Sequence, residues 1–467
     1  MREHKMSNHN KGISRIILTL ALPFIILVIA YGSYKLFFIP DPVITGLDQF
    51  NILSSDKTVT LNTENIKSIE IAVYQNDYKI DLLNDLPEFS EKQYKLNIKP
   101  KSIGLGDGQA LIIVHAKAGL FKEVKHKIAS TIDTVPPVLE VLKAPRQINR
   151  GSSGAALLRV KGADSVFIKL VDPSHPEDYR QFKAYELSSA LDVLDEPSRE
   201  HEIKSDNTPG TRAGSSPLKY LAFFPAPYDI VENTLLYAVA SDIAGNVNIT
   251  SLSTRINLKE FKKSSIIIDD NFINRVVYPL LNETSMDDPA GSFKKVNEDL
   301  RDKSVEIIMN LAKNTAPRML WQGRFSQLKN SKVMAIYGDE RAYLYKEKKI
   351  SNSAHLGYDL ASYAKAPVQA ANSGIVNFAA DLSIYGNTVI IDHGMGLMSL
   401  YGHLSAMTVE KGDRVKRGDM IGKTGSTGLA GGDHLHFGIL LHGYEVSPVY
   451  WWDRQWIRIH IMDYLTY

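Results

Sequence analysis

The organisation of this 467-residue chain can be derived from three segments near its C-terminus: AHLGYDLA (354–361), IIDHGMGLMSLYGHLS (390–405) and GGDHLHFGIL (431–440). The third segment places apolar β-formers around two histidines, a pattern typical of a strand. Successive side chains of a strand point to opposite faces, so we expect His434 and His436 to point the same way. The apolar residues between and after them would then face a core.

The other two segments add three more polar side chains. His355 and Asp359 are four positions apart, but Gly357 between them favours a strand or extended turn over a helix. His403 follows LMSLYG, at the end of the second arm of a hairpin that turns at GMG. A zinc ion prefers four tetrahedral positions, and imidazole nitrogen and carboxylate oxygen both suit it. A catalytic zinc keeps three protein ligands and an open position for water, so five such side chains make a metal site plausible.

HLGYDLA, SLYGHLS and DHLHF together resemble the lysostaphin-type zinc endopeptidases, which cut peptidoglycan cross-bridges. That family carries a His-x3-Asp motif, a lone histidine after a hairpin strand and a His-x-His motif. The resemblance implies one zinc ion per chain, held by His355, Asp359 and His436. It also implies that His403 and His434 orient the attacking water and stabilise the transition state.

The resemblance runs from about Gly338 to Trp452, roughly a quarter of the chain. Three motifs in the family's order are far more specific than any one of them alone. His393, in the hairpin turn, matches a His-Gly common in the family, and we expect it to be structural, with a hydrogen bond to the turn. GDMIGKTGSTG (418–428) is not a P-loop, because only three residues separate Gly418 from the Gly-Lys pair and four are required.

The composition bounds the remaining possibilities. The chain is too long for one core, and 44% apolar with 23% charged residues is ordinary for a globular protein. A formal net charge of +2 gives no argument for a nucleic-acid partner. The chain has no cysteine, which excludes disulfides, thiolate zinc ligands, a cysteine nucleophile and a lipoprotein anchor.

The first 40 residues predict a membrane anchor. An apolar run from Ile16 to Phe38 is long enough to span a bilayer of about 30 Å as a helix. It lacks the small-x-small site of a cleavable signal peptide, so we expect an uncleaved, single-pass signal anchor. The residues before the run include four basic ones, which place the N-terminus in the cytoplasm and everything after Pro40 outside the bacterial inner membrane, in the periplasm. They are Arg2, Lys5, Lys11 and Arg15.

Two β domains are predicted next, at residues 41–134 and 135–258. Short alternating strands separated by turn residues are typical of a β-sandwich. The prolines of DTVPPVLEV (133–141) mark the boundary, since they cannot join a central strand. YAVASDIAGNV (237–247) resembles the last strands of bacterial immunoglobulin-like modules, and the likeness is weaker for the first domain. The polar stretch 186–216 is predicted to be a long loop.

Residues 259–330 change to helical spacing, with Ser292 as an expected N-cap. This segment is either a connector that packs on the catalytic domain, which we favour, or a regulatory element that covers the zinc cleft or recruits a partner. Residues 331–467 form the predicted peptidase domain. The expected fold is therefore mainly β: an N-terminal transmembrane helix, two immunoglobulin-like β-sandwich domains, a helical connector and a C-terminal antiparallel β peptidase domain.

The predicted function is that of a membrane-anchored, zinc-dependent endopeptidase that hydrolyses peptide cross-links of peptidoglycan during cell-wall remodelling. The expected partners are peptidoglycan peptide stems, the cytoplasmic membrane and an envelope protein, and a D-alanyl–diaminopimelate bridge is favoured over a glycine bridge. The alternative is a non-catalytic envelope regulator that binds peptidoglycan or activates a separate amidase. Relatives with that role usually lose metal ligands, whereas all five positions are present here.

Overall fold

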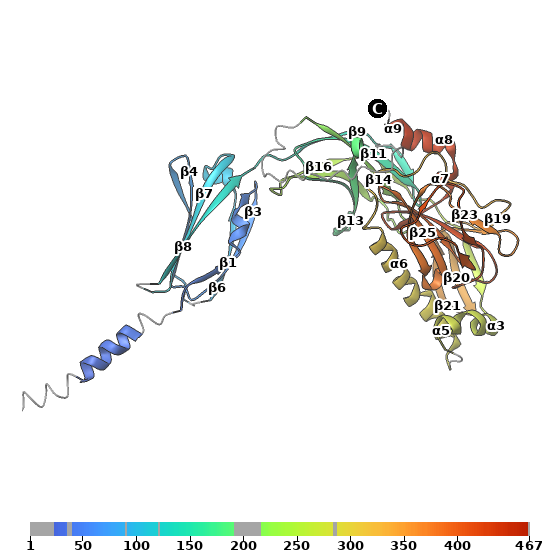
Figure 1. The fold of residues 1–467 in the computed structure, drawn as a ribbon, viewed down its shortest axis with the longest axis horizontal. Coiled ribbons are helices and arrows are strands. Elements are labelled where there is room, and N and C mark those ends of the chain that lie inside the picture. The colour runs from blue at the N-terminus through green and yellow to red at the C-terminus, as the bar shows by residue number, and fades with distance from the viewer. Residues whose placement is uncertain are drawn as a thin grey trace, which may run out of the picture. The chain divides into compact units, whose positions relative to one another are not determined.

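The computed structural model of the chain (Figure 1) describes residues 23–34, 40–88, 91–119, 122–190, 216–283 and 287–465. This part of the chain is mainly β, as predicted. It divides into two compact units, Met1–Pro136 with Ile243–Asn246 and Pro137–Asp242 with Val247–Tyr467.

The predicted membrane segment falls largely outside the described residues. A helix covers residues 23–34, but the four basic residues before the run, and Lys35 within it, lie outside the described ranges. No helix in the described ranges has both the length and the apolar character needed to cross a bilayer. The signal anchor therefore stays a prediction.

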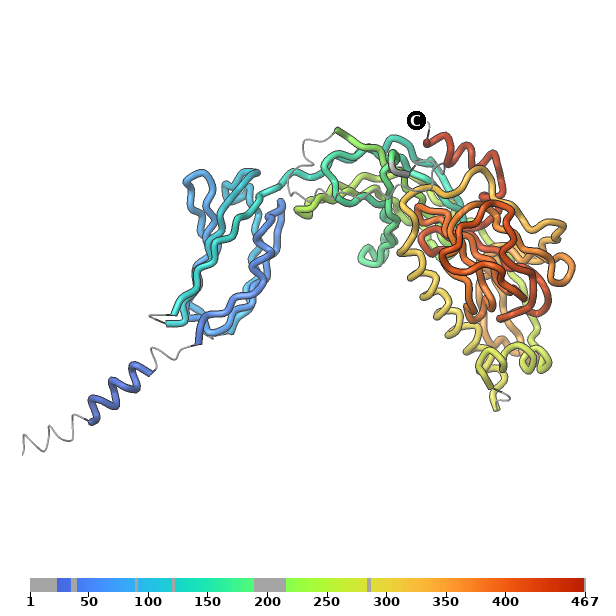
Figure 2. Tube along the Cα trace, viewed as in Figure 1, coloured from blue at the N-terminus to red at the C-terminus, as the bar shows by residue number. Residues whose placement is uncertain are grey.

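The first unit contains a β-sandwich, whose two layers are visible in Figures 1 and 2. One sheet has the order β1 (Val43–Thr45), β3 (Lys57–Glu64), β6 (Lys92–Ile98). The other has the order β2 (Ile52–Leu53), β8 (Glu123–Ile132), β7 (Gly108–Lys117), β4 (Ser68–Gln75), β5 (Tyr78–Asp85). The inward face of each sheet is apolar: Val59 and Leu61 of β3 meet Ile112 and Val114 of β7 in one buried cluster. The alternation seen in the sequence produces this sandwich.

The second unit begins with a seven-stranded sheet that curls on itself. Its order is β16 (Val247–Ser251), β15 (Leu235–Ser241), β12 (Ser165–Asp172), β13 (His175–Glu186), β14 (Leu218–Pro225), β11 (Ser153–Lys161), β9 (Val138–Lys143). Strand β9 lies against both β15 and β16, so the two ends of the sheet approach each other. β10 (Gln147–Asn149) and β17 (Arg255–Asn257) form a separate parallel pair, and a short helix α2 (Leu187–Ala190) follows β13. The immunoglobulin-like topology expected for both β domains stays a prediction.

Strands β11 and β14 are buried on both faces, which joins this region to the C-terminal one. On one face, Leu158 and Phe224 lie in the β region's own core. On the other face, Leu157 and Phe223 join a cluster that includes Trp451 from near the C-terminus. Residues on both sides of the predicted limits at 258 and 331 therefore belong to one compact unit with a shared core.

The helical segment predicted at 259–330 contains β18 (Lys263–Ile267), α3 (Asp270–Phe272), η3 (Ile273–Val277), α4 (Tyr278–Leu280), α5 (Pro289–Asn297) and α6 (Asp299–Leu311). The expected N-cap is wrong. Helix α5 begins at Pro289, and the Asp288 carboxylate accepts a hydrogen bond from the Gly291 amide at 2.9 Å. Ser292 lies inside the helix, because an Asp-Pro pair is a stronger helix start than a serine four residues later.

The C-terminal region is the predicted antiparallel β structure. Its main sheet has the order β19 (Lys332–Ala335), β22 (Tyr358–Ala361), β30 (Leu435–Leu441), β26 (Leu397–Gly402), β25 (Asn387–Gly394), β24 (Gly374–Asp381), β28 (Arg414–Val415), with β31 (Tyr444–Val446) paired to β30. A second sheet joins β18 to β20 (Asp339–Tyr345) and β21 (Lys348–His355), and a third joins β23 (Pro367–Gln369), β29 (Met420–Lys423) and β27 (Ala406–Met407).

Two 3-10 turns in the first unit, η1 (Leu47–Phe50) and η2 (Pro100–Ile103), and one in the second, η4 (Ser383–Tyr385), join strands. The chain then continues through α7 (Val449–Trp452), α8 (Arg454–Ile457), η5 (Arg458–Met462) and α9 (Asp463–Leu465). These short helices carry Trp451 and Ile457 into the same buried cluster as the main sheet.

Candidate metal centre

Strand pairing brings Asp359 and His436 together although 77 residues separate them along the chain. Strand β22 pairs with β30 in the register that sets Asp359 opposite His436. Directly opposed side chains of an antiparallel pair lie on the same face. His355, the last residue of β21, reaches the same place, so one metal-ligand group forms from His355, Asp359 and His436.

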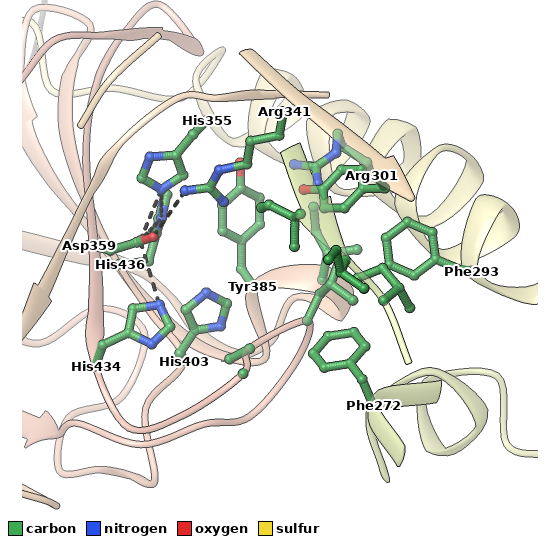
Figure 3. Close-up of a pocket in the computed structure, with 18 residues that line it drawn as sticks. Phe272, Phe293, Arg301, Arg341, His355, Asp359, Tyr385, His403, His434 and His436 are labelled. Carbon is green, nitrogen blue, oxygen red and sulfur yellow. Dashed lines mark hydrogen bonds and ion pairs between the residues drawn. The ribbon is translucent and has the colours of Figure 1, made fainter. Parts of the chain in front are cut away.

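The three ligand atoms of this group lie almost equally far apart (Figure 3). Nε2 of His355 is 2.9 Å from Oδ1 of Asp359 and 3.1 Å from Nδ1 of His436, and the last two atoms are 3.0 Å apart. Tetrahedral ligands at about 2.0–2.1 Å from zinc are about 3.3 Å from one another. Two imidazole nitrogens and one carboxylate oxygen at this spacing fit a zinc ion with one position left for water.

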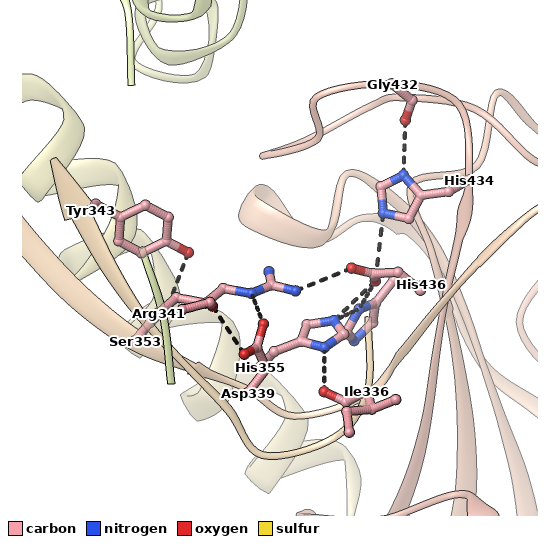
Figure 4. Close-up of polar contacts among 11 residues, drawn as sticks. Ile336, Asp339, Arg341, Tyr343, Ser353, His355, Gly432, His434 and His436 are labelled. Carbon is pink, nitrogen blue, oxygen red and sulfur yellow. Dashed lines mark hydrogen bonds and ion pairs between the residues drawn. The ribbon is translucent and has the colours of Figure 1, made fainter. Parts of the chain in front are cut away.

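Outer contacts orient these ligands (Figure 4). The His355 Nδ1–H donates to the Ile336 carbonyl at 3.0 Å, which leaves the Nε2 lone pair for the metal group. Arg341 donates from Nη2 to the outer oxygen of Asp359 at 3.3 Å and from Nε to Asp339 at 3.3 Å. Asp359 therefore presents Oδ1 inward while its second oxygen is held by the guanidinium.

The electrostatic environment keeps Asp359 and His436 in the protonation states that a metal needs. Burial alone would raise the pKa of Asp359, but the charge and hydrogen bonds of the surrounding imidazoles, His355 first, hold it well below 3.8. Burial lowers the pKa of His436 to about 4, so its ring is neutral at pH 7. Metal ligands must be deprotonated, and both conditions are met here.

Gly357 leaves room for the His436 ring. A Cβ atom at this position would lie 2.5 Å from His436 Nε2 and 2.8 Å from the Phe437 carbonyl oxygen. Both distances are shorter than van der Waals contact, so only glycine fits between His355 and Asp359. The glycine that argued against a helix at the sequence level has this packing role as well.

The remaining two histidines of the predicted site lie beside this group. His403 follows β26, and its Nδ1–H donates to the Thr427 carbonyl at 2.8 Å. His434 directly precedes β30, and its Nδ1–H donates to the Gly432 carbonyl at 2.8 Å. The two ring centroids are 4.8 Å apart, and Nε2 of His434 is 3.5 Å from Asp359 Oδ1.

The two rings differ in their affinity for a proton. Burial, and then the charges of His434 and His436, lower the pKa of His403 to about 3. For His434 burial is again the largest influence and lowers the pKa, but the hydrogen bond to Asp359, the charge of Asp359 and the hydrogen bond to Gly432 together outweigh it and raise the pKa above 6.5. The structure thus brings all five predicted side chains to one place. Their individual roles stay predictions.

Residues 353–448 match the family model described as Peptidase family M23. The C-terminal domain is an M23 peptidase domain. Over 95 residues it is 41% identical to the DD-carboxypeptidase/endopeptidase Mpg of Neisseria meningitidis serogroup B, covering 20% of this chain and 22% of that protein. It is 39% identical to the peptidoglycan DD-endopeptidase ShyA of Vibrio cholerae, also over 95 residues, which again cover 20% of this chain and 22% of that protein. The match thus spans about a fifth of these curated relatives.

Among solved structures, the catalytic domain of the antimicrobial peptidase lysostaphin from Staphylococcus simulans is similar to the M23 domain. The sequence identity is 26%, the match covers 31% of this chain and 100% of that one, and the TM-score is 0.23.

A cleft of about 330 Å³ opens beside the metal group and has walls from two parts of the chain. The M23 domain contributes the five predicted site residues together with Ile384, Tyr385 and the loop 429–431. The opposite wall comes from outside the matched residues. Its side chains belong to β18 and the segment after it, to α3, α5 and α6, and to β20: Ile266, Ile267, Ile268, Phe272, Phe293, Arg301, Arg341 and Tyr343.

The helical segment therefore packs on the M23 domain and also forms part of its cleft. The choice between a connector and a regulatory element stays a prediction. Arg301 and Arg341 are the charged cleft residues that the motif analysis missed. A signal for Arg301 exists in the sequence, because Arg301, Ser304 and Ile308 of α6 recur at helical spacing on the face that packs inward, in line with Asn297 at the end of α5. A single arginine on such a face is unusual unless it has a partner or a ligand.

His393 is structural but not in the expected way. It is fully buried, its Nδ1–H donates to the Ser373 carbonyl at 2.7 Å, and its Nε2 accepts from the Ser399 hydroxyl at 2.7 Å. Neither partner belongs to the hairpin turn, since Ser373 precedes β24 and Ser399 is in β26. The expected bond to the turn is made instead by Asp392, whose carboxylate accepts from the Gly394 amide at 2.9 Å.

Proposed function

We propose that this protein is a zinc-dependent endopeptidase that hydrolyses peptide cross-links of peptidoglycan. The observation that carries the proposal is the convergence of two imidazole nitrogens and one carboxylate oxygen within 3.1 Å of one another, beside a cleft that holds two more imidazoles. The similarity to the DD-carboxypeptidase/endopeptidase Mpg and to the peptidoglycan DD-endopeptidase ShyA supports the substrate class. The DD-endopeptidase activity named for these two relatives also favours an amide bond between two D-configured residues over a glycine bridge as the bond that is cleaved.

In this proposal, His355, Asp359 and His436 hold the zinc ion, and Arg341 keeps the Asp359 carboxylate in place. Bound zinc supplies a Lewis acid that polarises the scissile carbonyl and lowers the pKa of a bound water from 15.7 to about 7. The open side of the ligand group faces the cleft, where an extended peptide would be accepted.

His403 and His434 would share the proton transfers. His403 is neutral, and its Nδ1–H is committed to Thr427, so its Nε2 lone pair is available to accept a proton. His434 has the higher pKa of the two, and its Nδ1–H is committed to Gly432. Its Nε2 is therefore suited to donate a hydrogen bond to a developing oxyanion or a proton to the leaving amine.

We further propose that the protein acts outside the cytoplasmic membrane while anchored by its N-terminal segment. The support is the apolar run from Ile16 to Phe38 and the basic residues before it. A peptidoglycan substrate requires this location, since the cell wall lies outside the membrane.

The test uses the full chain, purified in detergent, incubated with purified peptidoglycan with and without a zinc chelator. Mass analysis of the released muropeptides should show a chelator-sensitive loss of cross-linked dimers and identify the bond. His436→Ala should abolish this loss and lower the zinc content below one ion per chain. His175→Ala, which removes an exposed histidine of the second unit, should change neither.

Two results would contradict the proposal. Absence of bound zinc in the wild-type protein would remove the chemistry altogether. One bound zinc per chain without any cleavage would instead favour the non-catalytic regulator.

A further inference from the structure

The wall of the cleft opposite the metal group is apolar except for its two arginines and the hydroxyl of Tyr343, which is hydrogen-bonded to Ser353. Ile266, Ile267 and Phe272 supply the accessible apolar surface, whereas Ile268 and Phe293 are buried. Figure 3 shows both phenyl rings on the far side of the cleft from His403 and His434. Arg301 of α6 lines the same cleft. This wall lies outside residues 353–448, so the M23 domain alone does not account for it.

Buried hydrogen bonds hold the Arg301 side chain in place. Its Nε donates to the Asn297 carbonyl at 3.0 Å, and its Nη2 donates to Asn297 Oδ1 at 2.8 Å. Asn297 is 1% exposed, and its own amide donates to the Ser351 hydroxyl at 2.8 Å and the Asn352 carbonyl at 3.2 Å. The guanidinium is therefore oriented by a chain of bonds that reaches β21, the strand that carries His355, and continues from the Ser351 hydroxyl to the Glu298 carboxylate at 2.8 Å.

Arg301 has no carboxylate partner among the residues that the structure describes. Arg341, the other arginine of the cleft, is committed to Asp339 and Asp359. Glu445 lies close enough for its charge to interact with Arg301, but its carboxylate accepts a hydrogen bond from the Tyr385 hydroxyl at 3.3 Å. The two bonds from Arg301 to Asn297 are both to neutral acceptors, so among the described residues no carboxylate forms an ion pair with the guanidinium at the cleft.

A half-buried guanidinium with free N–H groups is suited to a carboxylate, which it can bind through two parallel hydrogen bonds. Peptidoglycan stems carry carboxylates close to their cross-links. We propose that Arg301 binds a carboxylate of the substrate peptide and so makes the enzyme select cross-links with a free carboxylate near the scissile amide. The inference rests on the proposed function, and Phe272 and Ile266 would receive the aliphatic part of the same residue.

The carboxylate can have two sources: the side chain of a diamino acid at the cross-link, or the C-terminus of a stem peptide. The experiment uses purified cross-linked dimers in matched pairs, in which one of these carboxylates at a time is converted to the primary amide. In one of the two pairs, the full chain should cleave the acid form with a kcat/KM roughly 10- to 100-fold above that of the amide form. The pair that shows the preference identifies the source.

Arg301→Gln should bring that ratio close to one, mainly through a higher KM for the acid form. Arg301→Lys keeps the charge but loses the planar fork, so it should retain part of the preference. Lys303→Gln removes an exposed positive charge from the same helix and should leave the ratio unchanged. Zinc content and thermal unfolding of each variant show whether it is folded and loaded, and Arg301→Lys replaces Arg301→Gln if the latter does not fold.

The inference is overturned if Arg301→Gln keeps the wild-type ratio, or if the wild-type protein cleaves acid and amide forms equally in both pairs. Failure of this inference can be distinguished from failure of the proposed function by a binding measurement with the same dimers in an uncleavable form. If the wild-type protein cleaves no dimer, the proposed endopeptidase function is contradicted. Weaker binding of the acid form to Arg301→Gln, by the same roughly 10- to 100-fold, would still support the carboxylate site.

Discussion

The Oδ1 atom of Asp359 lies 3.0 Å from the Nδ1 atom of His436, across two neighbouring antiparallel strands of one sheet. The contact depends on the register of β22 and β30, since a slip by one residue would turn one of the two side chains to the opposite face. The geometry of the ligand group is thus a property of the sheet, and changes in the residues that support these strands should alter metal binding.

Arg341→Gln should weaken zinc binding although Arg341 is not a ligand. It removes the hydrogen bond to the outer oxygen of Asp359, and loss of such an outer contact typically lowers metal affinity about 10- to 100-fold. Competition with a chromophoric zinc chelator measures the affinity. Arg414→Gln, at an exposed arginine of β28, is the matched control. An unchanged affinity would mean that the strands alone hold Asp359.

Gly357→Ala should displace the His436 ring. The new Cβ would lie 2.5 Å from His436 Nε2, and inserting a methyl group at a packed site usually costs about 1–3 kcal/mol. We expect a lower unfolding midpoint together with loss of zinc, measured by calorimetry and by metal analysis. Gly106→Ala, at an exposed glycine whose nearest neighbour is 4.0 Å from the added Cβ, should change neither. Full zinc occupancy in Gly357→Ala would refute this packing role.

The buried His393 should make the zinc-free protein less stable in acid. Burial lowers its pKa from 6.5 to about 4, so the native state resists a proton that the unfolded state accepts. Its contribution to stability is fully present above pH 6.5 and is lost as the pH falls to about 4, which amounts to about 3 kcal/mol.

The corresponding measurement is urea unfolding at pH 7.5 and pH 4.5, followed by the fluorescence of the four tryptophans, which lie in or against the same buried cluster as the main sheet. His393→Gln should be less stable than wild type at pH 7.5, yet lose less stability between the two pH values. An equal loss in both proteins would contradict the assignment and attribute the acid sensitivity to the other buried histidines.

Phe223→Ala should destabilise the M23 domain although Phe223 belongs to β14 of the preceding β region. The ring is fully buried and packs edge-on against Trp451 with centroids 6.5 Å apart. Truncation of a buried phenylalanine costs about 3–5 kcal/mol. Ile249→Ala, at an exposed position of β16, should cost less than about 0.5 kcal/mol. Two separate unfolding transitions, with the later one unaffected by Phe223→Ala, would argue against a shared core.

Local patterns in the sequence were sufficient for the elements that carry the site. Alternation around His434 and His436 predicted the strand β30, and its apolar residues Leu435, Phe437 and Ile439 do face the core. The hairpin before His403 and the extended form around Asp359 were also correct. Helix signals were less reliable, because the N-cap at Ser292 competed with a stronger start at Asp288. The membrane anchor and the immunoglobulin-like topologies stay predictions.

By itself, the sequence determined which side chains could bind a metal. The spacing of residues along a strand and the order of the three motifs can both be read directly along the chain. Only the tertiary structure decided what surrounds them. Arg301, the phenyl rings of the cleft and the Phe223–Trp451 contact join segments far apart in the chain. Such contacts depend on how the faces of separate elements pack, and the periodicity of one element indicates that a face is buried without indicating which other segment covers it.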